Sequence, residues 1–368
     1  MKKSLLLVGA FLTVAAMAQA KEIVPAPVVV EEAPVQVVEK EVIVYRDREP
    51  QGFRPNGYVD LQYRYYGEAE ELNYKNNGVN NNYGRTQLMG KINMTENQAL
   101  EYRIRSYNDW NSSSNEKQKG EDGTQTRLRY FYNHGNLGDS NVNLTSRIEY
   151  RKEAENDAQS LEYQARFNFA DYLFNNDFVK TTEFTIAPKY KYYWASNSDD
   201  YQNRLGIDLF TMHQFPFGFS FEFNLYGDQY FYGQRQYTND HSTVKNNTGL
   251  TMEAYLYNTT NLYTNDKVDI DFYFEGGYDP YNWNSEKVLR TAINEKGDLK
   301  DPANYTYNDN TYELYAYPQI ITTYKVSPNF NVYASLGAEY RNWANINQKS
   351  AKDWRWQPTA VVGFKTTF

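Results

Sequence analysis

The sequence predicts an all-β fold, a transmembrane antiparallel β-barrel of about 14 strands with short periplasmic turns and long extracellular loops. Three observations indicate this fold. Residues 358–368 alternate between two faces without a break and end on an aromatic residue, Phe368. Segments with the same period of two recur along the chain from Gly57 onward. Aromatic residues make up 17% of the chain, which suits two aromatic girdles at membrane interfaces better than a soluble core.

The first 20 residues have the composition of a secretory signal peptide. Lys2 and Lys3 form its basic start, residues 5–14 its apolar run, and residues 18–20 the Ala-Gln-Ala pattern of a cleavage site. We therefore expect cleavage between Ala20 and Lys21. No later stretch has the roughly 18 to 20 apolar residues of a membrane helix, and the mean hydropathy is −0.81. A barrel accommodates this value because only every second residue of a strand faces lipid.

Residues 21–55 differ in composition from the rest of the chain. Prolines at positions 25, 27, 34 and 50 lie among Val and Glu residues. This composition is typical of an extended or partly ordered segment, here on the periplasmic side. Two roles remain open for it, a tether to the cell wall and a simple spacer.

Residues 56–368 are predicted to form the barrel, because fourteen segments with period two follow one another between turn-rich breaks. An even number is typical of single-chain bacterial barrels, in which both ends of the barrel lie on the periplasmic side. The segments are residues 59–66, 85–92, 100–105, 127–132, 142–150, 161–169, 184–194, 205–211, 219–225, 250–256, 268–274, 312–322, 330–340 and 358–368. Phe368 is interpreted as the C-terminal signal that the barrel-assembly machinery reads.

The connections alternate in length. Short ones at 95–98, 134–140, 215–218 and 326–328 are predicted to be periplasmic turns. Long ones at 67–83, 109–123, 227–246 and 278–310 are rich in Asn, Asp, Gly and Ser, and are predicted to be extracellular loops. The longest, or another long loop, is a candidate for a constriction of the lumen.

If the apolar register faces lipid, the other register lines the lumen, and it divides by charge. Its first half is mainly basic and its second half mainly acidic, so we expect two oppositely charged walls. The basic wall comprises Arg64, Arg85, Lys91, Arg103, Arg105, Arg127, Arg129, Arg147, Arg151, Arg166, Lys189 and Lys191. The acidic wall comprises Asp208, Glu222, Glu253, Asp269, Asp271, Glu275 and Glu313.

So many inward charges favour a wet interior, because an unpaired charge in a dry interior costs several kcal/mol. The sequence therefore predicts a water-filled channel for passive diffusion of small hydrophilic solutes and ions. One alternative is that the Arg and Glu residues pair across neighbouring strands into a network that plugs the barrel.

Residues 42–68 resemble the start of the fusobacterial major outer-membrane porin family (FomA-like). The resemblance lies in a YRDRE motif at 45–49, an RPNG motif at 54–57 and a first strand of the V-D-x-Q-Y-R type at 59–64. It implies a homotrimeric, weakly selective porin of the outer membrane that also acts as a surface adhesin. No individual selectivity residue is carried over by these motifs.

The sequence also bears on other classes of protein. The chain has no Cys, which excludes disulfides and thiolate metal sites, and its formal net charge of −8 argues against nucleic acid as a partner. An enzyme is not expected, because the three His (His134, His213 and His241) lie in no catalytic context, although Ser242 follows His241. We expect no cofactor and no metal. A substrate-specific channel and a barrel that serves only as adhesin or structural anchor remain alternatives.

Overall fold

The computed structural model describes residues 52–70, 82–109, 123–154, 158–195, 201–238, 242–288, 313–343 and 353–368. The predicted signal peptide, its cleavage position at Ala20 and Lys21, and residues 21–51 of the proposed periplasmic segment lie outside these ranges. Within them no helix is long and apolar enough to span a membrane.

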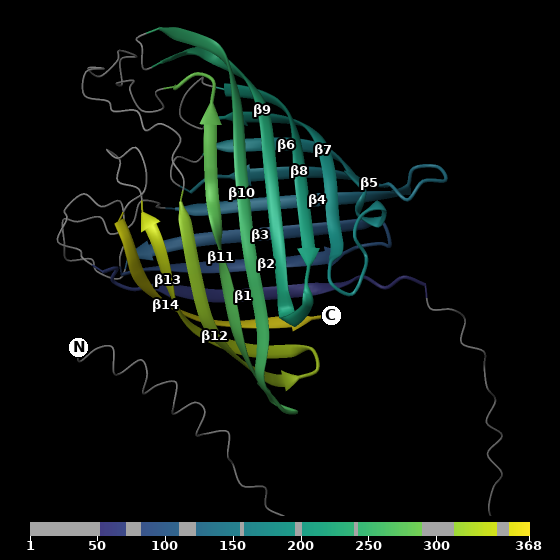
Figure 1. Ribbon diagram of the computed structural model, residues 1–368, viewed down its shortest axis with the longest axis vertical. Helices are drawn as coiled ribbons and strands as arrows, with labels where there is room; N and C mark the ends of the chain where they lie inside the picture. The colour runs from purple at the N-terminus through teal and green to yellow at the C-terminus, as the bar shows by residue number, and fades with distance from the viewer. Residues whose placement is uncertain are drawn as a thin grey trace, which may run out of the picture. The chain divides into compact units, whose positions relative to one another are not determined.

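Fourteen antiparallel strands form one closed barrel in which each strand pairs with its neighbours in sequence (Figure 1), so the predicted fold class is confirmed. The strands are β1 Asn56–Tyr66, β2 Tyr83–Asn93, β3 Gln98–Asp109, β4 Thr124–Asn136, β5 Asn143–Lys152, β6 Gln159–Asn168, β7 Lys180–Trp194, β8 Tyr201–Gln214, β9 Phe219–Tyr237, β10 Thr243–Thr264, β11 Val268–Asn284, β12 Leu314–Ser327, β13 Phe330–Trp343 and β14 Asp353–Thr367. Two short 3-10 turns, η1 Ala170–Tyr172 and η2 Pro216–Gly218, follow β6 and β8.

The barrel closes where β1 pairs with β14. Nine consecutive residue pairs join the two strands, from Tyr58 opposite Thr367 to Tyr66 opposite Thr359. Beyond them, Gly57 and Phe368 exchange two backbone hydrogen bonds, each 3.1 Å long. Every strand therefore has two partners, which satisfies the backbone polar groups that lipid leaves without water.

The short turns at one end of the barrel, here called the turn end, are built by side chains that satisfy backbone donors. Asn265 accepts hydrogen bonds from the backbone of Lys267 and Val268 in the turn between β10 and β11.

In η2, Gly218 has a φ of +75°, and a Cβ there would lie 2.1 Å from the carbonyl oxygen of Thr259. Glycine is thus required at this position.

The two faces of the barrel wall have the reverse of the burial pattern of a soluble protein. Ile148 and Ile207 point outward and are 44% and 60% exposed, whereas Gln164 and Asp208 point inward and are 0% and 2% exposed. The largest fully buried side chains among the described residues are all polar, namely Gln164, Asn342, Thr185, Thr238 and Asp208. An apolar outer surface of this extent needs an apolar solvent, which the bilayer supplies.

The lengths of β9, β10 and β11 correct one part of the sequence prediction. Residues 227–246 were expected to form a long loop, but β9 continues to Tyr237 and β10 begins at Thr243. Likewise β11 extends through the first part of the expected loop 278–310, to Asn284. With 22 residues, β10 is about twice as long as the roughly 9 to 11 residues that cross a bilayer. Turn-forming residues do not end a strand when a hydrogen-bonded partner continues beside it.

We predict that a cation on the outer face destabilises the barrel in lipid. Ile148→Arg places a charge near the middle of β5, and we expect a loss of about 2–4 kcal/mol in the free energy of unfolding, because the guanidinium must leave water for hydrocarbon. Denaturant titration in liposomes measures the loss.

Asp139→Arg is the matched control, because Asp139 lies in the exposed turn between β4 and β5. A change within about 0.5 kcal/mol is expected there. Equal stability of Ile148→Arg and the wild type would contradict the assignment of the outer face.

Candidate functional site: the inner wall

All of the residues predicted to line the lumen lie on one face of the wall. Directly opposed pairs link them around the barrel, for example Arg64 with Arg85, Glu101 with Arg129, and Glu162 with Lys191. The same face continues through Tyr257 opposite Glu275 and Asp60 opposite Lys365. Glu313 stands one residue before β12. Because successive side chains of a strand alternate between faces, these residues share one register. The burial of Gln164 and Asp208 in this register, against the exposure of Ile148 and Ile207 in the other, identifies it as the inner face.

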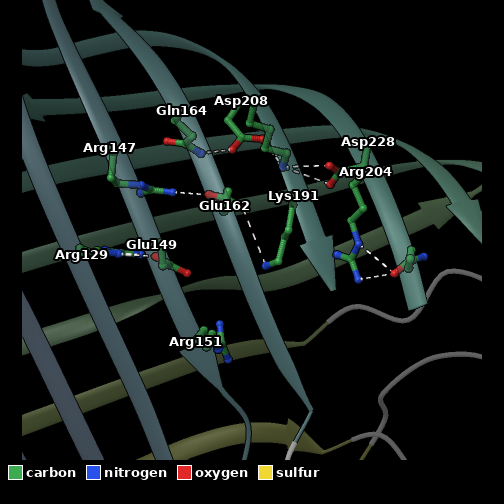
Figure 2. Close-up of polar contacts among 12 residues, drawn as sticks. Arg129, Arg147, Glu149, Arg151, Glu162, Gln164, Lys191, Arg204, Asp208 and Asp228 are labelled. Atoms are coloured by element: carbon green, nitrogen blue, oxygen red, sulfur yellow. Dashed lines mark hydrogen bonds and ion pairs between the residues drawn. The ribbon is translucent and has the colours of Figure 1, made fainter. Parts of the chain in front are cut away.

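The basic wall between β4 and β7 is largely neutralised by ion pairs with neighbouring strands (Figure 2). Arg129 contacts Glu149 at 2.5 Å, and Arg147 contacts Glu162 at 2.5 Å. Further cross-strand pairs join Arg166 with Glu183 at 2.6 Å, Lys191 with Glu162 at 3.8 Å and, between β2 and β3, Lys91 with Glu101 at 3.5 Å. Arg151 instead pairs at 2.6 Å with Glu153, two residues further along the same segment. Cross-strand pairing therefore holds these side chains against the wall.

A buried network on β6 to β9 joins the basic and acidic walls. The Lys189 ammonium lies 2.6 Å from Asp208 and 3.0 Å from Asp228, and Gln164 donates a 2.7 Å hydrogen bond to Asp208. Lys189 and Asp208 were assigned to opposite walls from sequence, but the structure brings them together. Asp228 was missed, because it lies in the segment that was interpreted as a loop. Its position opposite Gly206 puts it on the inner face.

Five arginines of the basic wall have no carboxylate within ion-pair distance among the described residues. They are Arg64 on β1, Arg85 on β2, Arg103 and Arg105 on β3, and Arg127 on β4. Arg103 and Arg105 instead donate to the amide oxygens of Gln125, at 3.3 Å, and Gln87, at 2.5 Å. The buried Nε atoms of Arg64, Arg85 and Arg103 have no hydrogen-bond partner. Positive charge is thus concentrated on four neighbouring strands.

Tyrosine hydroxyls hold much of the acidic wall. Glu222 accepts a hydrogen bond from Tyr257 at 2.8 Å, and Glu253 accepts one from Tyr226 at 3.0 Å. Tyr273 and Tyr315 both donate to Glu275. Aromatic residues were predicted mainly for the membrane girdles, and their role as hydrogen-bond donors to inner carboxylates was not predicted. The signal was present in the tyrosines that occupy inward positions of the alternating segments.

The remaining predicted acids lie near the ends of their strands. Asp269 contacts Lys325 at 2.8 Å, Asp271 accepts from Asn261 at 2.8 Å, and Glu313 contacts Arg341 at 2.7 Å. In the described parts of the chain no cluster of His, Asp or Glu is arranged to hold a metal ion.

Two histidines contact hydroxyls near the turn end. His134 Nε2 lies 2.9 Å from Ser146 Oγ, which also lies 3.0 Å from the Tyr163 hydroxyl, and His213 Nδ1 lies 3.0 Å from Thr181 Oγ1. His134 belongs to β4 and not to the turn that the sequence suggested. Among the described residues no carboxylate or amide hydrogen-bonds to either ring to complete a catalytic triad. His241, the third histidine, lies outside the described residues.

We predict that the buried Lys189 network contributes strongly to stability. Lys189→Met leaves Asp208 and Asp228 buried without their cation, so a loss of about 3–5 kcal/mol in the free energy of unfolding is expected. Lys91→Met is the matched control, because the pair of Lys91 with Glu101 is partly exposed and is expected to contribute about 0–1 kcal/mol. Denaturant titration of both variants in the same lipid measures the difference, and similar losses would argue against the buried network.

Comparison with known proteins gives structural similarity only. No family model matches the sequence, and no curated protein matches it. The chain is similar to a solved bacterial polysaccharide outer-membrane secretin, with 9% identity over 85% of this chain and 98% of the other, at a TM-score of 0.37. It is also similar to an anion-selective porin from Comamonas acidovorans, with 8% identity over 86% and 99% of the two chains at a TM-score of 0.32, and to OmpT of Vibrio cholerae, with 8% identity over 86% and 97% at 0.32. These similarities show the fold alone.

Proposed function

We propose that this protein is an outer-membrane porin that forms a water-filled channel for passive diffusion of small hydrophilic solutes and ions. The observation that carries the proposal is the inner wall itself, where charged side chains from every part of the closed barrel share one face. Charges lining a barrel interior require water or counter-ions, because an uncompensated charge in a dry interior costs several kcal/mol.

The size of the barrel supports the same proposal. An eight-stranded barrel is just wide enough for side chains to fill its interior, whereas fourteen strands enclose a wider lumen. Many inner side chains form cross-strand ion pairs, such as Arg129 with Glu149. In this proposal, pairing along the wall neutralises charge and leaves the axis of the barrel to solutes.

The environment and partners of the protein are part of the proposal. Export by a signal peptide, assembly by the barrel-assembly machinery and association into a homotrimer follow from the sequence and from its resemblance to the fusobacterial family. Adhesion to other surfaces through the long loops is compatible with conduction. A barrel that acts only as an adhesin or anchor, and a channel for one specific solute, are the alternatives that the experiment must separate.

Substituted cysteines test the open lumen directly, because the chain has no Cys of its own. Arg129→Cys places a thiol on the inner face, and Leu128→Cys places one on the outer face of the same strand. In planar lipid bilayers we expect ohmic steps for both variants. A charged, water-soluble methanethiosulfonate should reduce the current through Arg129→Cys and leave Leu128→Cys unchanged.

The outcomes discriminate between the functions. Conductance that rises with bulk salt, together with modification of Arg129→Cys alone, supports the porin. Folded protein without conductance supports an adhesin or anchor with a plugged barrel. A reduction of the ion current that saturates with the concentration of one neutral sugar or peptide supports a specific channel.

A further inference from the structure

The twelve predicted cations of the basic wall fall into two groups. Seven of them contact carboxylates, as described above. The other five, Arg64, Arg85, Arg103, Arg105 and Arg127, have no such contact in the described part of the chain, and they occupy four consecutive strands. We call these five residues the arginine cluster.

Like charges oppose one another directly within the arginine cluster. Arg64 is the cross-strand partner of Arg85, and Arg103 is the partner of Arg127. Arg127 in turn faces Arg151 on β5. Guanidinium groups stay charged at any physiological pH, and like charges directly opposite one another in a sheet are destabilising. An arrangement of this kind needs a compensating negative charge.

Glutamines occupy the positions where acids would neutralise the cluster. Gln87 of β2 and Gln125 of β4 both lie opposite Arg105 of β3. Each accepts a hydrogen bond from an arginine of β3, and Gln125 donates to Glu153 at 3.1 Å. That second bond turns the amide oxygen of Gln125 toward Arg103. The glutamines therefore orient the guanidinium groups without removing their charge.

Aromatic rings support the end of the cluster on β1 and β2. The Arg64 guanidinium carbon lies 5.9 Å from the ring centre of Tyr66 and 5.5 Å from that of Tyr317 on β12. Arg85 lies 5.8 Å from the Tyr66 ring. These contacts hold the two guanidinium groups near the rings by cation–π attraction but supply no anion. The buried Nε atoms of Arg64, Arg85 and Arg103 have no hydrogen-bond partner, and neither do those of the ion-paired Arg147 and Arg151.

We propose that the arginine cluster is a binding site for solutes that carry several oxyanion groups, of the oligophosphate class. Planar guanidinium groups recognise phosphate oxygens by paired hydrogen bonds. Four strands at a spacing of about 4.8 Å span roughly 14 Å, which matches a chain of linked phosphates better than a single small anion. The inference rests on the proposed channel, because the solute reaches the inner wall through the lumen.

The test places carboxylates at the two positions opposite Arg105 that glutamines occupy. Gln87→Glu with Gln125→Glu changes no side-chain size and supplies two acids to the arginine cluster. The control is Gln202→Glu, because Gln202 accepts hydrogen bonds from Arg204 at 3.0 and 2.8 Å on β8, away from the cluster. Inorganic triphosphate is the probe, applied at fixed ionic strength because screening alters exposed charges.

Two measurements are made on each folded protein. One is the block of potassium chloride current by triphosphate in planar bilayers, and the other is triphosphate binding by calorimetry in neutral detergent. For the double variant we expect an affinity at least about tenfold below that of the wild type, because charge-assisted hydrogen bonds to the ligand are lost. For Gln202→Glu we expect a change within about twofold.

A second pair of variants guards against a folding defect. Arg103→Gln with Arg127→Gln removes two unpaired charges, and Lys91→Gln with Arg166→Gln removes two paired ones from the same wall. Only the first pair should weaken triphosphate binding at least about tenfold.

The outcomes separate this inference from the proposed channel. Conductance without any effect of triphosphate, or an equal loss of binding in cluster and control variants, overturns the binding site alone. Calorimetric binding that the cluster variants abolish, in a barrel that does not conduct, supports the site and overturns the channel. Absence of both conductance and triphosphate binding overturns both the channel and the binding site.

Discussion

The closure of the hydrogen-bonded ladder between β1 and β14 is the constraint on which the rest of the structure depends. An open sheet would leave two edges of unpaired backbone groups, which a bilayer cannot satisfy. The exchange of hydrogen bonds between Gly57 and Phe368 completes this ladder at the turn end. Closure also fixes which face is inside. With a side-chain period of two, a slip of one residue in a strand would expose its charges to lipid and turn its apolar residues inward.

The charged side chains of the inner wall are held by three different kinds of contact in different parts of the barrel. From β4 to β9, acids and bases pair across strands, and the Lys189 network is buried. From β9 to β12, carboxylates accept hydrogen bonds from tyrosine hydroxyls. These bonds orient the carboxylates without neutralising their charge. From β1 to β4, arginines are oriented by glutamines and aromatic rings, which leaves a net positive surface. The lumen is therefore electrically uneven, although most of its charges are compensated nearby.

Much of this organisation was predictable because of the strict alternation of the strands. The inner register, including Arg64, Glu149 and Asp208, follows from counting in twos from each apolar residue. Strand ends were predicted less well, as β9 and β10 show, because hydrogen bonding to a neighbouring strand continues where local composition favours a turn. Asp228 was not predicted as an inner residue for the same reason.

By itself, the sequence determined the fold class, the number of strands and which side chains of each strand share a face, because these follow from local periodicity. Only the tertiary structure decided which inner charges neutralise one another. Lys189 and Asp228 are 39 residues apart in the chain, and Tyr317 and Arg64 are brought together only when the barrel closes. Pair formation depends on strand register and on the reach of each side chain across the sheet. For that reason the arginine cluster appears in the sequence only as part of a longer basic wall, and becomes distinct when its neighbours are paired.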